Sequence, residues 1–176
     1  MVFYLCGDVG GTNSRLQLFE LRADGSTIQV AKTVFPSKKY SHLSIIIKQF
    51  LEETSLSAPP LAACIAVAGP VKNNTCHVTN LNWSLNGDEL AAALGIKRFL
   101  LINDFAAIGF GLLALRDEDK ILLNKDAKPV PAAPIACLGA GTGLGEVYLT
   151  HNGQNYDVRQ RLKTTSAYRL SWCTLI

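Results

Sequence analysis

Apolar and polar positions along this chain recur with the periods of strands and helices. Residues 2–7, 61–68, 99–102 and 135–138 are short apolar runs of the length expected for buried strands. Residues 14–21 alternate between apolar and polar side chains, as a half-buried strand does, and 28–35 is expected to return beside it. Apolar residues recur at helical spacing in 41–54, in 88–94 and from Phe105 to Leu115. This order of strands and helices predicts an α/β protein.

The most apolar stretch, residues 99–115, is interrupted by Asn103 and Asp104. They fall where the strand-like run ends and the helical spacing begins. An ionised carboxylate among apolar neighbours is unfavourable unless it has a partner or a function. In open α/β sheets, ligands bind at the carboxyl ends of the strands. Asp104 is therefore interpreted as a helix N-cap, as a functional group, or as both.

Two glycine-rich loops, GDVGGTN at 7–13 and GAGTGLG at 139–145, each lie between two expected strands. Glycines allow backbone N–H groups to converge on an anion, and Thr12, Asn13 and Thr142 add donors. Asp8 is suited to hold a phosphate-bound Mg²⁺ through water. Each loop alone also fits a tight hairpin turn. There is no Walker loop, and the dinucleotide fingerprint fails because Leu144 stands at its sixth position.

Charge and cysteine content exclude several classes of protein. The net charge of +3 is due to the tail, since 159–176 holds four basic residues and no acidic one. The rest of the chain has no basic footprint, so no nucleic-acid partner is expected. No apolar run reaches the length of a membrane-spanning helix. The five cysteines form no CxxC pair, and Cys6, Cys64 and Cys137 lie in apolar runs, which indicates reduced core thiols and a cytoplasmic location.

The ordered set GDVGGTN, INDF at 102–105 and GAGTGLG resembles bacterial-type glucokinase, and VTNLNW at 78–83 fits the same pattern. The resemblance covers residues 2–158 and places the chain in the actin-like ATPase/hexokinase superfamily. It implies a ribonuclease H-like N-terminal domain, 1–115, and the start of a second, incomplete α/β domain, 116–158. Residues 159–176 would form a divergent tail.

The resemblance also implies an activity, the ATP-dependent phosphorylation of glucose to glucose 6-phosphate in glycolysis, with Mg²⁺ as cofactor. Asp104 would be the general base on the 6-hydroxyl, and Asn103 would hydrogen-bond the sugar. Asn80 would approach the sugar too, or is simply a turn residue. The residues implied to contact ATP are Gly7, Asp8, Val9, Gly10, Gly11, Thr12, Gly139, Gly141, Thr142 and Gly143, and Asp8 would also serve the metal.

The sequence departs from the family after the second loop. The family's E-G-G-H motif, whose Glu and His hold the sugar, does not occur here, and 159–176 resembles an altered C-terminus. A non-catalytic truncated isoform, binding a ligand or partner weakly, is therefore the alternative. A sugar-sensing repressor is disfavoured because those proteins place a helix-turn-helix before the first loop. We expect 116–176 to be mobile or to self-associate, so a homo-oligomer is among the expected states.

Overall fold

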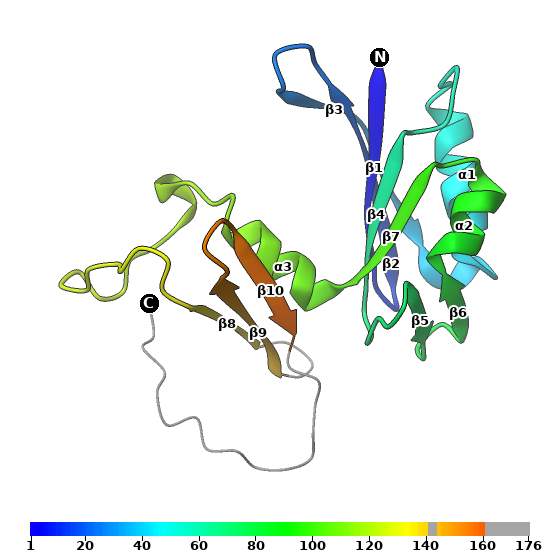
Figure 1. Cartoon of the computed structure of the whole chain (residues 1–176). Coiled ribbons are helices and arrows are strands. Elements are labelled where there is room, and N and C mark those ends of the chain that lie inside the picture. Colours follow the sequence, from blue (N-terminus) through cyan, green and yellow to red (C-terminus); the bar gives the residue numbers. More distant parts are fainter. Residues whose placement is uncertain (141–143, 161–176) are drawn as a thin grey trace. The chain divides into compact units, whose positions relative to one another are not determined.

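The computed structural model describes residues 1–140 and 144–160 (Figure 1). The chain divides into two compact units, Met1–Asp104 and Phe105–Ile176. The domain boundary expected near residue 115 lies beyond the helix that opens the second unit. As a boundary between independently folding domains it stays a prediction. Of the expected tail, 159–176, residues 161–176 lie outside the described residues. No helix in the described ranges is long and apolar enough to cross a membrane.

A five-stranded mixed sheet forms the centre of the first unit. Its order is β3-β2-β1-β4-β7. The first three strands pair antiparallel, whereas β1, β4 and β7 run parallel. All five strands lie where the alternating and apolar runs predicted a strand. The bounds are β1 Val2–Val9, β2 Asn13–Leu21, β3 Thr27–Pro36, β4 Ala62–Val67 and β7 Arg98–Asn103.

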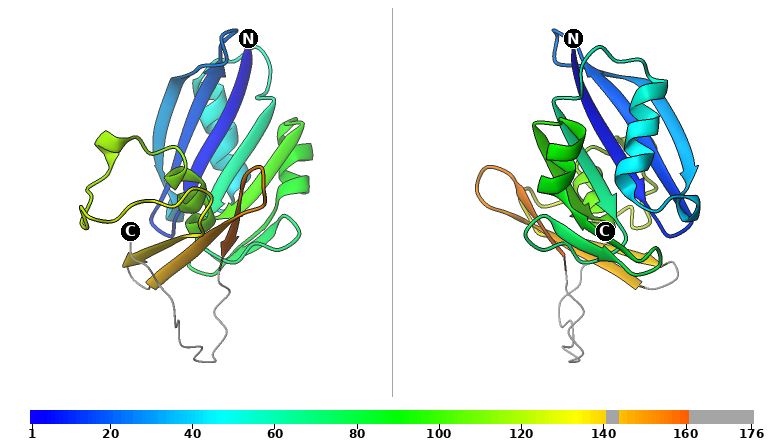
Figure 2. Two further views of the ribbon diagram at one scale, coloured as in Figure 1. Left: turned by 60° about the vertical axis from the view of Figure 1, so that its left-hand side comes forward. Right: turned by 90° about the vertical axis from the view of Figure 1, so that its right-hand side faces the viewer.

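Two helices, α1 (Leu43–Glu53) and α2 (Gly87–Leu94), lie on the same side of this sheet (Figures 1 and 2). They bury its inner face, because apolar side chains from both helices and from all five strands form one core cluster. Gly95 ends α2 in the left-handed conformation, at φ 66°, which glycine adopts readily.

A small hairpin, β5 (Thr75–Val78) and β6 (Trp83–Asn86), completes the first unit. The preceding turn has positive φ at Asn73 and Asn74, as expected for adjacent asparagines. The side chain of Asn74 then pairs with the free edge of β7, accepting from Leu101 N–H at 2.8 Å and donating to Phe99 C=O at 2.9 Å. Asn74 thus replaces a neighbouring strand at the edge of the sheet.

Helix α3 spans Asp104–Leu112, and all of it after Asp104 belongs to the second unit. The second unit also contains a three-stranded antiparallel sheet in the order β10-β9-β8. Gly109 of α3 allows close packing, because a Cβ there would come within 2.9 Å of Val158. The helix ends at Leu112, earlier than the apolar spacing up to Leu115 predicted. The N–H groups of residues 113–115 donate to the carbonyl three residues earlier, not four. The remaining bounds are β8 Ile135–Ala140, β9 Leu144–His151, β10 Tyr156–Gln160 and a 3₁₀ turn at Asp117–Asp119.

Candidate active site

Three parallel strands end together at one edge of the first unit's sheet. Val9 is the register partner of Val67, and Val67 is the partner of Asn103. The residues that follow β1, β4 and β7 therefore begin at the same edge. They are the glycine loop after Val9, Ala68 and Gly69 after β4, and Asp104 after β7. This is the position at which open α/β sheets bind ligands.

The first glycine loop is held in place by buried hydroxyl groups. Gly10 N–H donates to Asn13 C=O at 2.9 Å, which closes the turn. Ser37 contacts the loop twice: its N–H donates to Thr12 C=O and its Oγ donates to Gly10 C=O, both at 2.9 Å. Ser14 Oγ lies 2.9 Å from Ser37 Oγ, and both serines are fully buried. Sequence reasoning missed Ser37, because a single serine after a strand carries no distinguishing pattern.

The glycines of this loop differ in how much space the surrounding residues leave for a side chain. Gly7 faces the core, since a Cβ there would come within 2.7 Å of Ile65 and 2.8 Å of Leu16. Gly11 lies against Asn80, with 3.1 Å between its ideal Cβ and that of Asn80. At Gly10 the nearest atom would be 3.5 Å away, an ordinary contact. Packing therefore accounts for glycine at position 7, but not at position 10.

Asp8 lies near the end of β1 on the face opposite to the core. Its Oδ2 accepts from Arg15 Nη1 at 3.0 Å, and both side chains are about half exposed. An exposed ion pair of this kind contributes about 0–1 kcal/mol. Asp8 is thus a hard oxygen donor whose present partner is readily exchanged, which fits the single carboxylate that Mg²⁺ often uses together with phosphate oxygens.

Asn103 and Asp104 lie at the expected junction, since β7 ends at Asn103 and α3 begins at Asp104. Asn103 is 7% exposed, and its Nδ2 donates to Gly69 C=O at 2.9 Å, which fixes the orientation of the amide. Asp104 is half-buried and lies in the first helical turn, where a negative charge is favoured. Burial, and after it the charge of Asp104, raises the pKa of the Cys76 thiol, so this carboxylate lies near Cys76. Cys76 was not singled out from the sequence.

The second glycine loop belongs to the second unit. Gly139 and Gly145 both pack against the ring of Phe105, and a Cβ at Gly139 would come within 2.5 Å of its Cζ. Both glycines thus have a packing explanation inside this unit. Gly141, Thr142 and Gly143, which were expected to contact phosphate, lie outside the described residues.

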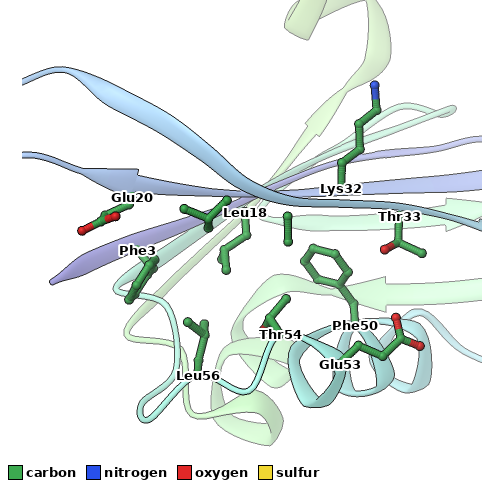
Figure 3. A pocket seen from close by; sticks show the side chains of 11 residues that line it. Phe3, Leu18, Glu20, Lys32, Thr33, Phe50, Glu53, Thr54 and Leu56 are labelled. Carbon is green, nitrogen blue, oxygen red and sulfur yellow. The ribbon is translucent and has the colours of Figure 1, made fainter.

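A cavity of about 640 Å³ lies elsewhere in the first unit, between the β2–β3 hairpin and the end of α1 (Figure 3). Phe3, Leu18 and Phe50 form its apolar wall, and Glu20 and Glu53 lie at its sides (Figure 3). Phe3 is near the start of β1, whereas the glycine loop follows its end. No expected site residue lines this cavity, so we place the candidate site at the strand ends.

The glucokinase family model matches residues 5–161. This chain belongs to the glucokinase family. A glucokinase from Nostoc sp. is 40% identical over 158 residues, which are 90% of this chain and 46% of that protein. The chain therefore spans about half the length of the curated glucokinases it matches.

Solved structures of glucokinases agree with the fold. The glucokinase from an Antarctic psychrotroph superposes with a TM-score of 0.79 at 29% identity, over 92% of this chain and 50% of that one. The glucokinase from Balamuthia mandrillaris in complex with glucose has a TM-score of 0.68 at 24% identity, over 92% and 48%. The predicted actin-like ATPase fold, with a mixed sheet at its centre, is thereby confirmed.

Proposed function

We propose that this chain carries the N-terminal half of a site for ATP-dependent phosphorylation of glucose to glucose 6-phosphate. The observation that carries the proposal is the register row Val9–Val67–Asn103. It brings an anion-binding type of loop and a polar Asn-Asp pair to the same edge of one sheet. The family membership supplies the reaction that suits both groups.

Asn103 and Asp104 would form the sugar side of the site. The amide of Asn103 is held by Gly69 C=O, so it presents a fixed group to a polyol. Asp104 would accept the proton of the attacking 6-hydroxyl, a role that typically contributes about 10²–10⁴-fold to the rate. Asn80 contacts Gly11 from the β5–β6 turn and would thereby join the sugar side to the phosphate side.

The first loop would form the phosphate side. At Gly10 the packing does not require a glycine, so its missing side chain would serve to let a phosphate approach the backbone. Gly11 and Thr12 follow it in the loop. Asp8 would hold a water of the Mg²⁺ that neutralises the ATP phosphates. Phosphoryl transfer depends mainly on such positioning and charge neutralisation. Gly139, Gly141, Thr142 and Gly143 are proposed as the second phosphate contact.

We also infer a cytoplasmic location and place homo-oligomers among the expected states. Cys6, Cys64, Cys76 and Cys137 are all free thiols, which supports a reducing compartment. Leu138 and Tyr148 of the second unit's sheet are about half exposed, which favours contact between copies of the chain.

A chimera tests the proposed function directly. Residues 1–158 would replace the corresponding half of the Nostoc sp. glucokinase, which supplies the C-terminal half that this chain does not span. We expect glucose-dependent formation of glucose 6-phosphate that requires both ATP and Mg²⁺. A chimera that folds and binds glucose but transfers no phosphate at any nucleotide concentration would refute the proposal.

A further inference from the structure

Cys6 and Cys64 form a pair of thiols on adjacent parallel strands. They are direct register partners between β1 and β4. Their sequence neighbours Leu5 and Ile65 are fully buried beneath α1 and α2. Because side chains alternate along a strand, both thiols project from the opposite face of the sheet. Both residues are half-buried rather than core residues, which corrects the expectation from the sequence.

The row of the sheet that holds the two cysteines continues with one apolar and one polar residue. Leu100 is the next residue in the same row, in register with Cys64, and it is 52% exposed. Gln17 is the partner of Cys6 on the other side. An apolar group attached to the two sulfurs would therefore lie on Leu100 and remove part of its surface from water.

The spacing of the strands favours a bridged pair over a disulfide. In-register Cβ atoms of parallel strands are separated by about the strand spacing, ~4.8 Å. A relaxed disulfide needs Cβ atoms about 3.5–4.5 Å apart, so direct oxidation would require the strands to approach. One additional atom between the two sulfurs removes that requirement.

The chemistry of the pair favours a neutral bridging atom over a metal cation. Burial raises the pKa of the Cys6 thiol, and burial together with repulsion from Cys6 raises the pKa of Cys64. Two adjacent thiolates, as a divalent cation would need, are therefore disfavoured. In addition, no group of three or more His, Cys, Asp or Glu within the described ranges is placed to hold a metal ion.

We propose that Cys6 and Cys64 form a dithiol site for trivalent organic arsenicals of the type R–As(OH)₂. Two As–S bonds form and two As–O bonds break. Each departing hydroxide takes one thiol proton, so two waters leave. Arsenic stays trivalent and no electrons are exchanged, so the step consumes the protonated thiols that this environment maintains.

Phenylarsine oxide and intact-mass spectrometry of the folded 176-residue chain test the proposal. We expect one phenylarsenic group to bind to each chain. A small dithiol should release this group, whereas a monothiol at the same concentration should not. In the parent chain the adduct should protect Cys6 and Cys64, and no other cysteine, from alkylation by N-ethylmaleimide. Protection of a different pair would overturn the assignment without the use of any variant.

Matched substitutions give a second, independent readout. Cys6→Ala and Cys64→Ala should each lose the dithiol-reversible adduct, whereas Cys137→Ala and Cys173→Ala should retain it. Circular dichroism would establish that each variant is folded. Retention of the adduct in either folded Cys6→Ala or folded Cys64→Ala would contradict the proposal.

Discussion

At the scale of single residues, a substitution of Gly10 distinguishes a ligand-binding role of this glycine from a packing role. An added Cβ would meet nothing closer than 3.5 Å, and Gly10 is not at positive φ. Gly10→Ala should therefore leave unfolding stability unchanged. On the proposed function it should lower the affinity for Mg-ATP, because the new methyl group would lie where the phosphates are proposed to bind.

Calorimetric titration of Mg-ATP into the chimera measures this effect, and we expect glucose affinity to change less. Gly111→Ala is the matched control, since Gly111 is an exposed glycine with no atom near its added Cβ. Equal nucleotide affinity in Gly10→Ala and parent would count against phosphate contact at this loop. Gly11→Val is a poorer test, because its side chain would also displace Asn80.

At the scale of elements, Asn74 hydrogen-bonds the outer edge of β7, the strand that leads to Asn103 and Asp104. Asn74→Ala leaves Leu101 N–H and Phe99 C=O at the sheet edge without this partner. At about 1 kcal/mol for each hydrogen bond, the free energy of unfolding should fall by about 2 kcal/mol.

Asn73→Ala is the control for this prediction. Asn73 also has positive φ, at 49°, but its side chain makes no hydrogen bond within the described ranges. Urea unfolding followed by fluorescence of the buried Trp83, in a Trp172→Phe background, reports on this unit. Equal loss of stability in both variants would show that backbone strain, not the edge contact, dominates.

The same elements show how far the sequence predicts the structure. Periodicity located the central strands, α1, α2 and the Asn103–Asp104 junction, because burial on one face imposes a pattern on the sequence. It did not predict the contact of Ser37 with the loop or of Asn74 with β7. Those contacts join residues 27 positions apart, from Gly10 to Ser37 and from Asn74 to Leu101, and depend on tertiary geometry. The end of α3 was also placed too late, because apolar spacing continues beyond the last helical turn.

At the scale of the whole molecule, the family resemblance implies that an E-G-G-H motif holds the sugar together with Asn103 and Asp104. Asn103 and Asp104 are present, but no E-G-G-H motif occurs in this 176-residue sequence. A site built to pair with polar groups loses heavily when partners are missing. The isolated chain should therefore turn over far below the usual enzyme median of ~10 s⁻¹.

A coupled assay of the purified chain, with the chimera as positive control, measures that turnover. Near-median turnover from the chain alone would show that its own residues complete the sugar site. Binding of glucose or ATP without turnover would instead agree with the alternative of a non-catalytic ligand-binding form.

The rate of phosphate transfer in Asp104→Asn tests the central claim most directly. Asparagine preserves the size of the side chain beside Cys76 but cannot accept the proton of the 6-hydroxyl. In the chimera, kcat should fall by about 10²–10⁴-fold with a smaller change in the KM for glucose. Asp24→Asn, in the exposed turn closed by Ser26, should leave both constants unchanged. A kcat for Asp104→Asn within a factor of about two of the parent would contradict the account, since the carboxylate would then have no part in the reaction.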